Sequence, residues 1–194
     1  MKTEDAGYTR RLSNNSWWKN LLDVQRPYRI HIQSLNLGKV LEIGCGVGRN
    51  LINLGGSVEN VGIDHNPTSI NMAKGRGLTA FTPEGFKNSA YSNTLFDSLL
   101  VAHVFEHLTK ADANKLLEEY LPYLKSKGKI VIITPQKAGF ASDPTHVTMM
   151  DPQLVSAILG SVGSRILKQY SFPFPYWVGD FFKYNENISI AFKD

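Results

Sequence analysis

The chain has 194 residues, of which 42% are hydrophobic and 20% charged, with a formal net charge of +4 at pH 7. That length suffices for one well-cored domain and is short for two, so we expect a single domain over residues 1–194. The one cysteine, Cys45, excludes a disulfide framework and a multi-cysteine metal site. No apolar run approaches the roughly 20 residues of a membrane helix, so we expect a soluble, cytoplasmic protein without a secretory leader.

A net charge of +4 is compatible with a nucleic-acid partner, which would need basic residues gathered on one face. Here they are scattered along the chain. The densest group, residues 125–129, falls where we expect a helix to end, and lysines stabilise that end of a helix through its dipole. We therefore interpret the positive charge as a solvated surface.

We expect an N-terminal helical cap over residues 1–37, followed by a core over 38–194. Residues 16–35 are rich in large apolar side chains and are interrupted by Pro27, which predicts two short amphipathic helices. Two interpretations of this segment stay open. It either closes over a ligand or packs on the sheet surface, and packing is the preferred reading for its two tryptophans.

The core begins with an apolar strand within residues 40–51 that runs into Gly44, Gly46 and Gly48 and then into a helix. Glycine allows tight turns and a close approach of the backbone to a ligand. The first N–H groups of the following helix have no partner inside the helix. The stretch is therefore predicted to be a ligand-binding loop.

Further along the chain, strands are expected at 58–63, 79–81 and 96–102. Between the first two of these, Asn66 and Pro67 predict the start of a helix, and Gly75 and Gly77 its end.

In the second half, Thr109 and Asp112 predict the start of a helix that Gly128 ends. A fifth strand is expected at 129–134, a helix that begins with Asp151 and Pro152, and final strands at 165–172 and 188–192. Strands that alternate with helices predict an α/β fold with a mostly parallel sheet and helices on both faces.

The spacing of the glycines distinguishes two kinds of cofactor. A dinucleotide site needs G-x-G-x-x-G, but Arg49 stands at the position of the last glycine. G-x-G-x-G after Glu42 instead resembles the first motif of the class I S-adenosylmethionine-dependent methyltransferases.

The resemblance covers about residues 38 to 192 and includes 61–64, the strand from Phe96, and the glycine-led strand at 127–132. It implies a Rossmann-like, doubly wound sheet of seven strands. It also implies S-adenosyl-L-methionine as the cofactor, and the branch that acts on small molecules and lipids.

Asp64 lies 20 residues beyond Gly44, at the end of the second strand. A carboxylate there can accept hydrogen bonds from both ribose hydroxyls, and the alternative is a turn aspartate before the Asn-Pro cap. The resemblance implies further cofactor contacts. They are Glu42, Cys45, Asn50, His65 and Ala102 near the donor, Tyr28 and Arg29 at its methionine end, and Thr82, Glu84 and Phe86 at its adenine. Cys45 itself reads as a small filler of the loop rather than a nucleophile.

Ligands of such sheets bind beyond the carboxyl ends of the strands, where residues 102–107 read Ala-His-Val-Phe-Glu-His. His103 and His146 are the candidate bases that would take a proton from the acceptor. Alternatively, the adjoining Glu106 and His107 only organise the loop, and transfer needs no base when the nucleophile is unprotonated.

The chain lacks the Asn/Asp-Pro-Pro-aromatic motif and the second cysteine of nucleobase methyltransferases. We therefore expect O- or N-methylation of a small-molecule or lipid-like acceptor, with neither nucleic acid nor membrane as partner. The aromatic stretch 172–177 has three interpretations: an apolar acceptor site, a contact in a homodimer, or a lid on the core.

Two rival functions remain. Residues 103–107 also satisfy H-x-x-E-H, the inverted zinc-protease signature, in which His103, Glu106 and His107 would serve a zinc hydrolase. That signature needs both histidines on one helix face, whereas here the residues follow a buried strand and precede the Thr109 cap. The other rival is a non-catalytic module that binds the cofactor.

Overall fold

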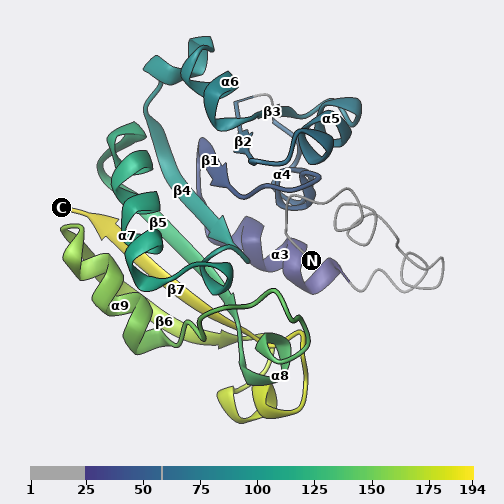
Figure 1. Cartoon of the computed structure of the whole chain (residues 1–194), viewed down its shortest axis with the longest axis vertical. Coiled ribbons are helices and arrows are strands. Elements are labelled where there is room, and N and C mark those ends of the chain that lie inside the picture. The colour runs from purple at the N-terminus through teal and green to yellow at the C-terminus, as the bar shows by residue number, and fades with distance from the viewer. Residues whose placement is uncertain (1–24, 58) are drawn as a thin grey trace. The chain divides into compact units, whose positions relative to one another are not determined.

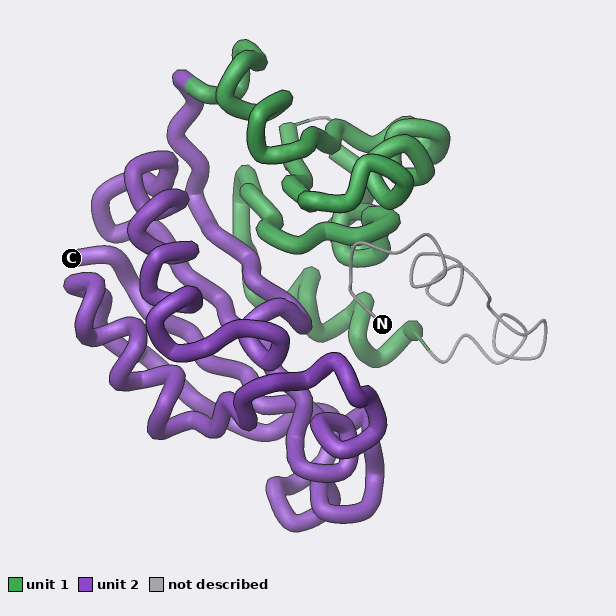
Figure 2. The backbone as a smooth tube through the Cα atoms, in the orientation of Figure 1, with its two compact units in different colours: residues 1–92 green, residues 93–194 purple. Residues whose placement is uncertain are grey.

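The computed structural model describes residues 25–57 and 59–194 (Figure 1). Backbone contacts divide the chain into two compact units, Met1–Ser92 and Asn93–Asp194, shown in green and purple in Figure 2. Trp17, Trp18 and the first of the two expected N-terminal helices lie outside the described residues. The expectation of a single domain with a cap over residues 1–37 stays a prediction.

The first unit contains three short parallel strands. β1 (Val40–Ile43) pairs with β2 (Val61–Ile63), and β2 pairs with β3 (Thr79–Phe81). The helices around them are α3 (Arg26–Ser34), α4 (Arg49–Asn53), α5 (Pro67–Gly75), α6 (Pro83–Lys87) and the 3-10 turn η1 (Ala90–Asn93).

The local signals of this unit act as expected. Asn66 caps α5, because its Oδ1 accepts a hydrogen bond from the amide of Thr68 at 2.9 Å. Pro27 lies in the first turn of α3, so it begins that helix. The second strand starts at Val61 rather than at residue 58, which lies outside the described residues.

The second unit is built on four longer strands. β4 (Phe96–Ala102) runs parallel to β5 (Leu124–Pro135), while β7 (Glu186–Lys193) runs antiparallel to both β5 and β6 (Ser164–Phe172). Its helices are α7 (Lys110–Tyr120), α8 (Lys137–Phe140) and α9 (Pro152–Ser161), with 3-10 turns η2 (Phe105–His107), η3 (Leu121–Tyr123) and η4 (Tyr176–Asp180). Figure 1 shows α7 and α9 next to each other, and Ser161 Oγ donates to Asn114 Oδ1 at 3.0 Å.

One element differs clearly from the prediction. The helix that begins at the Thr109 cap ends at Tyr120 instead of reaching Gly128, and β5 already begins at Leu124. Pro122 lies in the intervening η3 turn and has no N–H to continue an α-helix. The basic residues 125–129 therefore belong to a strand and not to a helix end, and Lys125 Nζ lies 2.6 Å from Asp97 Oδ1.

The strand order of the seven-stranded sheet is β3-β2-β1-β4-β5-β7-β6. The central strands are buried along most of their length, as their near-continuous apolar sequences predicted. This mixed, mostly parallel sheet with alternating helices confirms the predicted α/β fold class. In the part of the chain that is described, no helix has the length and apolarity that a membrane crossing requires.

Candidate functional site

The loop after β1 needs glycine for its backbone geometry. Gly44, Gly46 and Gly48 all have positive φ angles, of 75°, 52° and 82°, in the region that disfavours residues with a side chain. At Gly48 a Cβ atom would also overlap Leu78 Cδ1. The loop therefore depends on these glycines for both conformation and packing.

The amides of this loop are largely used inside the protein. Ile63 O accepts hydrogen bonds from the amides of Gly44 and Cys45, at 2.7 and 3.0 Å. The amide of Gly46 donates to Asp64 Oδ2 at 2.8 Å. What the loop gives a ligand is thus mainly a bare backbone that permits close approach, with the leading N–H groups of α4 beyond it.

Asp64 has a structural role that the sequence motif did not reveal. Its Oδ2 holds Gly46, and its Oδ1 accepts from the amide of Asn66 at 2.8 Å. The carboxylate thereby ties the glycine loop to the end of β2. Each oxygen has a further lone pair, so the predicted ribose contact stays open as a prediction. His65 Nδ1 lies 3.9 Å from Oδ1, with half of its side chain exposed.

Glu42 is the buried acid of β1. Its Oε1 accepts from Asn50 Nδ2 at 2.7 Å, while its Oε2 has no hydrogen-bond partner among the described residues. Desolvation by burial is the main reason that the pKa of Glu42 rises to about 8; the negative charge of Asp64 adds to the rise and the Asn50 hydrogen bond opposes it. Glu42 is therefore mostly protonated at neutral pH, and a bound cation would favour its ionised form.

Cys45 behaves as the filler that the sequence suggested. Its side chain packs in an apolar cluster with Leu51, Ile70, Ala73 and Ala80. Burial raises the pKa of the Cys45 thiol well above its usual value, so the reactive thiolate is suppressed.

The residues expected near adenine differ in exposure. Thr82 caps α6 by accepting from the amide of Gly85 at 3.2 Å, and Glu84 is exposed in the first turn of that helix. Phe86 is fully buried, so its ring supports this segment from the core side. Thr82 and Glu84 are thus the accessible members of the predicted adenine set.

Tyr28 and Arg29, expected at the methionine end, lie on α3 and are partly buried. This helix is fastened to α4 because Gln33 Nε2 donates to Asn53 O at 2.7 Å. The contacts of Tyr28 and Arg29 with a cofactor stay predictions.

The second unit holds the predicted acceptor side. Ala102 is buried at the end of β4, and His103 follows with a positive φ of 57°. His103 Nδ1 lies 3.3 Å from Glu106 Oε1, and its Nε2 lies 2.8 Å from Glu186 Oε1. Both ring nitrogens of His103 therefore face carboxylates.

These contacts set the charge of His103. Desolvation lowers the pKa of this imidazole, but its close contacts with the negatively charged Glu106 and Glu186 outweigh this effect and raise the pKa to about 10. The side chain is 49% exposed, so solvent weakens part of this attraction. In this geometry His103 is protonated: its Nε2 donates to Glu186 Oε1, and its Nδ1 makes an ion-pair contact with Glu106 Oε1. The predicted role as a base would require one of these contacts to break.

His146 is the other predicted base. It lies in the segment between α8 and α9, and its ring packs edge-on against that of His107, with centroids 4.8 Å apart.

The H-x-x-E-H signature of residues 103–107 does not lie on one helix. His103 precedes the short turn η2, which spans only Phe105–His107.

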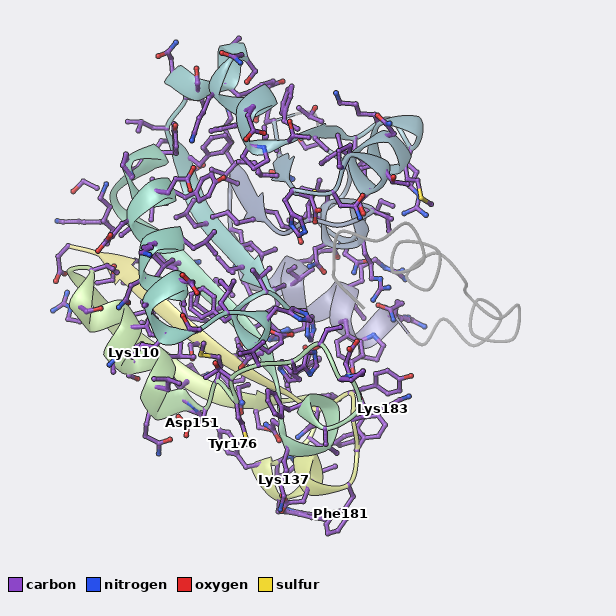
Figure 3. The ribbon with its side chains drawn as sticks, viewed as in Figure 1. Lys110, Lys137, Asp151, Tyr176, Phe181 and Lys183 are labelled. Atoms are coloured by element: carbon purple, nitrogen blue, oxygen red, sulfur yellow. The ribbon has the colours of Figure 1, made fainter. Side chains whose placement is uncertain are left out.

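The aromatic stretch before and within η4 is largely exposed. Trp177 is 68% and Phe181 82% exposed, and Figure 3 labels Tyr176 and Phe181 at this end of the unit. Such exposure does not fit a lid that rests on the core. An acceptor site and a homodimer contact stay open.

The fold and these residues define an α/β enzyme class that binds a nucleotide-type cofactor at a glycine loop. A methyltransferase-domain family model matches residues 11–172, and the chain therefore belongs to this methyltransferase family. This confirms the family that the motifs predicted. No curated protein sequence matches the chain.

Solved structures share the fold at low identity. Magnesium protoporphyrin IX methyltransferase from Synechocystis PCC 6803, with bound S-adenosylhomocysteine, is 16% identical over 99% of this chain and 96% of that one, with a TM-score of 0.67. A SAM-dependent methyltransferase from Archaeoglobus fulgidus is 20% identical over 92% and 100%, with a TM-score of 0.66. The N-methyltransferase NodS from Bradyrhizobium japonicum WM9 is 16% identical over 87% and 96%, with a TM-score of 0.63.

Proposed function

We propose that this protein transfers a methyl group from S-adenosylmethionine to a small-molecule acceptor. The observation that carries the proposal is the loop after β1, in which Gly44, Gly46 and Gly48 bring bare backbone to the end of the sheet beside Asp64 and Glu42. The family match and the bound S-adenosylhomocysteine of the Synechocystis enzyme support it.

The residues present suit this cofactor better than a dinucleotide. S-adenosylmethionine carries a sulfonium and an ammonium instead of a pyrophosphate, and the unsatisfied buried Oε2 of Glu42 is complementary to a cation. Asp64 retains lone pairs for ribose hydroxyls, and Thr82 and Glu84 are accessible for adenine. When bound, the cofactor supplies an activated methyl group for in-line displacement.

For the acceptor we propose a hydroxyl or amine of a small or lipid-like molecule. The support is the rim after β4, where an imidazole at His103 and the carboxylates of Glu106 and Glu186 lie together. We propose that protonated His103 orients an acceptor by donating a hydrogen bond when one of its contacts with Glu106 and Glu186 opens. Alignment with the methyl donor then supplies most of the rate enhancement.

Calorimetric titration with S-adenosylmethionine and S-adenosylhomocysteine tests the cofactor. We expect both to bind the wild type and to bind Asp64→Ala at least roughly 10-fold more weakly, since a charge-assisted hydrogen bond contributes about 1.5 to 3 kcal/mol. Asp194→Ala, which removes an exposed carboxylate, is the matched control. If neither compound binds folded wild-type protein, the proposal is wrong.

A methyl-transfer assay with radiolabelled cofactor and panels of small hydroxyl and amine compounds tests turnover. Binding without any transfer to these panels would favour the non-catalytic module. Transfer to a nucleic acid instead would contradict the acceptor class.

A further inference from the structure

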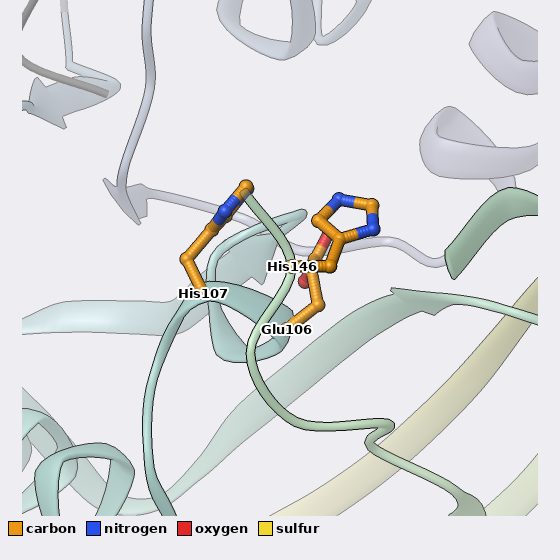
Figure 4. A group of neighbouring side chains, drawn as sticks. All are labelled: Glu106, His107 and His146. Carbon is orange, nitrogen blue, oxygen red and sulfur yellow. The ribbon is translucent and has the colours of Figure 1, made fainter. Parts of the chain in front are cut away.

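Three potential metal ligands meet in the second unit at positions far apart in the sequence. Glu106 and His107 come from η2, and His146 comes from the segment between α8 and α9 (Figure 4). One ligand-capable atom of each lies within 4.8 Å of the other two. Neither the family match nor the fold assigns a role to this group.

The segment that carries His146 is held against η2 by backbone contacts. Glu106 O accepts hydrogen bonds from the amides of Val147 and Thr148, at 2.7 and 3.2 Å. The His146 ring also stacks on Phe140, with ring centroids 5.4 Å apart. The three side chains are therefore brought together by the fold itself.

The hydrogen bonds of His107 determine which of its nitrogens is available. Its Nδ1 lies 3.2 Å from Thr145 O and 3.3 Å from Thr145 Oγ1. The Thr145 hydroxyl already donates to Asp143 Oδ1 at 2.7 Å, and the Thr145 carbonyl has no hydrogen to donate. Thr145 O and Thr145 Oγ1 can therefore only accept from His107. Nδ1 must therefore carry the proton, which leaves the lone pair on Nε2.

His146 has the same arrangement. Its Nδ1 lies 2.8 Å from Phe140 O, a carbonyl that can only accept, so Nδ1 is the protonated nitrogen here too. Histidines that bind metals almost always donate their second ring N–H to a carbonyl or carboxylate in this way. In the neutral form, both rings present an Nε2 lone pair, and no described residue hydrogen-bonds either Nε2.

Glu106 supplies the negative charge. Its side chain is only 1% exposed, and neither carboxylate oxygen has a hydrogen-bond partner among the described residues. His103 Nδ1, at 3.3 Å from Oε1, makes an ion-pair contact on one side. A buried carboxylate with unused acceptor capacity is costly unless a ligand completes it.

From this geometry we infer that Glu106, His107 and His146 form a binding site for a divalent transition-metal cation. Two imidazoles and one carboxylate suit zinc, cobalt, nickel or iron(II). Ligand atoms of a tetrahedral site lie about 3.3 Å apart, since the bonds are about 2.0 to 2.1 Å, so the three side chains would draw closer together around an ion than the 4.8 Å seen here. Three protein ligands leave coordination positions open for water or an oxygen ligand.

The ligand set differs from the H-x-x-E-H reading of the sequence. In that reading His103 and His107 would coordinate the metal with a distant acidic third ligand, and Glu106 would act as the base. In the structure His103 is engaged by Glu186, and Glu106 and His107 lie together with His146. Substitution of His103 should therefore leave metal binding intact, whereas substitution of His146 should weaken it.

The experiment uses the full chain after treatment with a chelator, titrated with Co²⁺ and Zn²⁺. We expect one equivalent of Co²⁺ to bind, with visible ligand-field absorption of a four- or five-coordinate site, and Zn²⁺ to displace it. His146→Ala and His107→Ala should each weaken Co²⁺ binding at least about 100-fold, since loss of a mere supporting residue already costs 10- to 100-fold. His31→Ala, which removes a histidine from α3, should bind like the wild type.

His103→Gln separates the two ligand sets and should retain the Co²⁺ spectrum. Thermal unfolding shows whether each variant is folded. Zn²⁺ should raise the unfolding temperature of the wild type and of His103→Gln, but not that of folded His146→Gln. Absence of stoichiometric binding to the wild type would overturn the inference. Equal losses in His31→Ala and His146→Ala, or loss in His103→Gln with retention in His146→Ala, would overturn it too.

Discussion

The glycine loop of the first unit and the histidine group of the second unit are built in different ways. The loop is a continuous stretch, and the feature that we propose faces the ligand is backbone with positive φ at Gly44, Gly46 and Gly48. The histidine group is assembled from Glu106, His107 and the distant His146 through side chains. A loop of the first kind can be recognised from spacing, whereas a group of the second kind exists only once the chain has folded.

The two regions also treat buried charge differently. Burial raises the pKa of Glu42 beside the loop to about 8, which outweighs the opposing hydrogen bond from Asn50 and the positive charge of Arg49. Glu106 is as buried as Glu42, but it faces the imidazoles of His103, His107 and His146. We propose that the first carboxyl receives a cationic group that arrives with the cofactor. The second lies in a group that can hold a cation by itself.

The largest effect should come from Gly48→Ala. The added Cβ would overlap Leu78 and force a residue with a side chain into a positive φ of 82°, so we expect roughly 2–4 kcal/mol of destabilisation. Cofactor binding should be lost as the loop shifts. Denaturant unfolding and calorimetry measure the two effects.

Gly160→Ala is the matched control, since nothing lies within 4 Å of its Cβ position in α9. It should gain roughly 0.5–1 kcal/mol from helix propensity. A Gly48→Ala protein as stable as this control, with cofactor binding intact, would show that the loop does not depend on its backbone.

Glu42→Gln should change how stability depends on pH. The folded pKa of about 8 lies above the ordinary 4.5, so the folded state holds a proton that the unfolded state releases between these values. The free energy of unfolding of the wild type should fall as pH rises from about 4.5 to 8. The variant should lack this fall and be more stable than the wild type by roughly 3 kcal/mol at pH 7.

Urea unfolding from pH 5 to 9 measures that difference, and Glu118→Gln, an exposed position on α7, is the control. Parallel wild-type and Glu42→Gln curves across the whole range would mean that Glu42 is ionised in the folded protein.

Asp143→Ala addresses the histidine group without touching a ligand. It removes the acceptor of the Thr145 hydroxyl, which can then donate to His107 Nδ1 and place the proton of that ring on Nε2. We expect Co²⁺ affinity to fall roughly 10-fold, as for other supporting residues of metal sites. Cofactor affinity should not change, since the cofactor site that we propose lies in the first unit. Unaltered Co²⁺ affinity would show that Thr145 does not determine which ring nitrogen of His107 carries the proton.

The smallest effect is expected from Asp151→Ala. Asp151 caps α9 by accepting from the amide of Leu154 at 2.8 Å, and loss of such a cap costs about 1 kcal/mol. Chemical unfolding should show this loss, while cofactor and metal titrations match the wild type. A large change in either affinity would mean that α9 positions one of the sites.

Much of the fold was predictable because its signals are local. The cap and proline before α5 and α9, and the apolar stretches at β3 and β4, gave elements close to those observed. The helix α7 was predicted too long. The prediction extended this helix because apolar residues continue at helical spacing to Leu124. In the structure the α-helix ends before Pro122, and Leu124 already belongs to β5.

By itself, the sequence determined the strand and helix order, the glycine loop, the methyltransferase family, and Asp64 at the end of β2. These features depend on residues near one another in the chain, so the sequence spacing of those residues determines the local backbone structure. Only the tertiary structure decided that Asp64 ties Gly46, that Glu186 engages His103, and that His146 joins Glu106 and His107. Each of these contacts joins side chains from separate segments, and their distance is set by how the strands and loops pack.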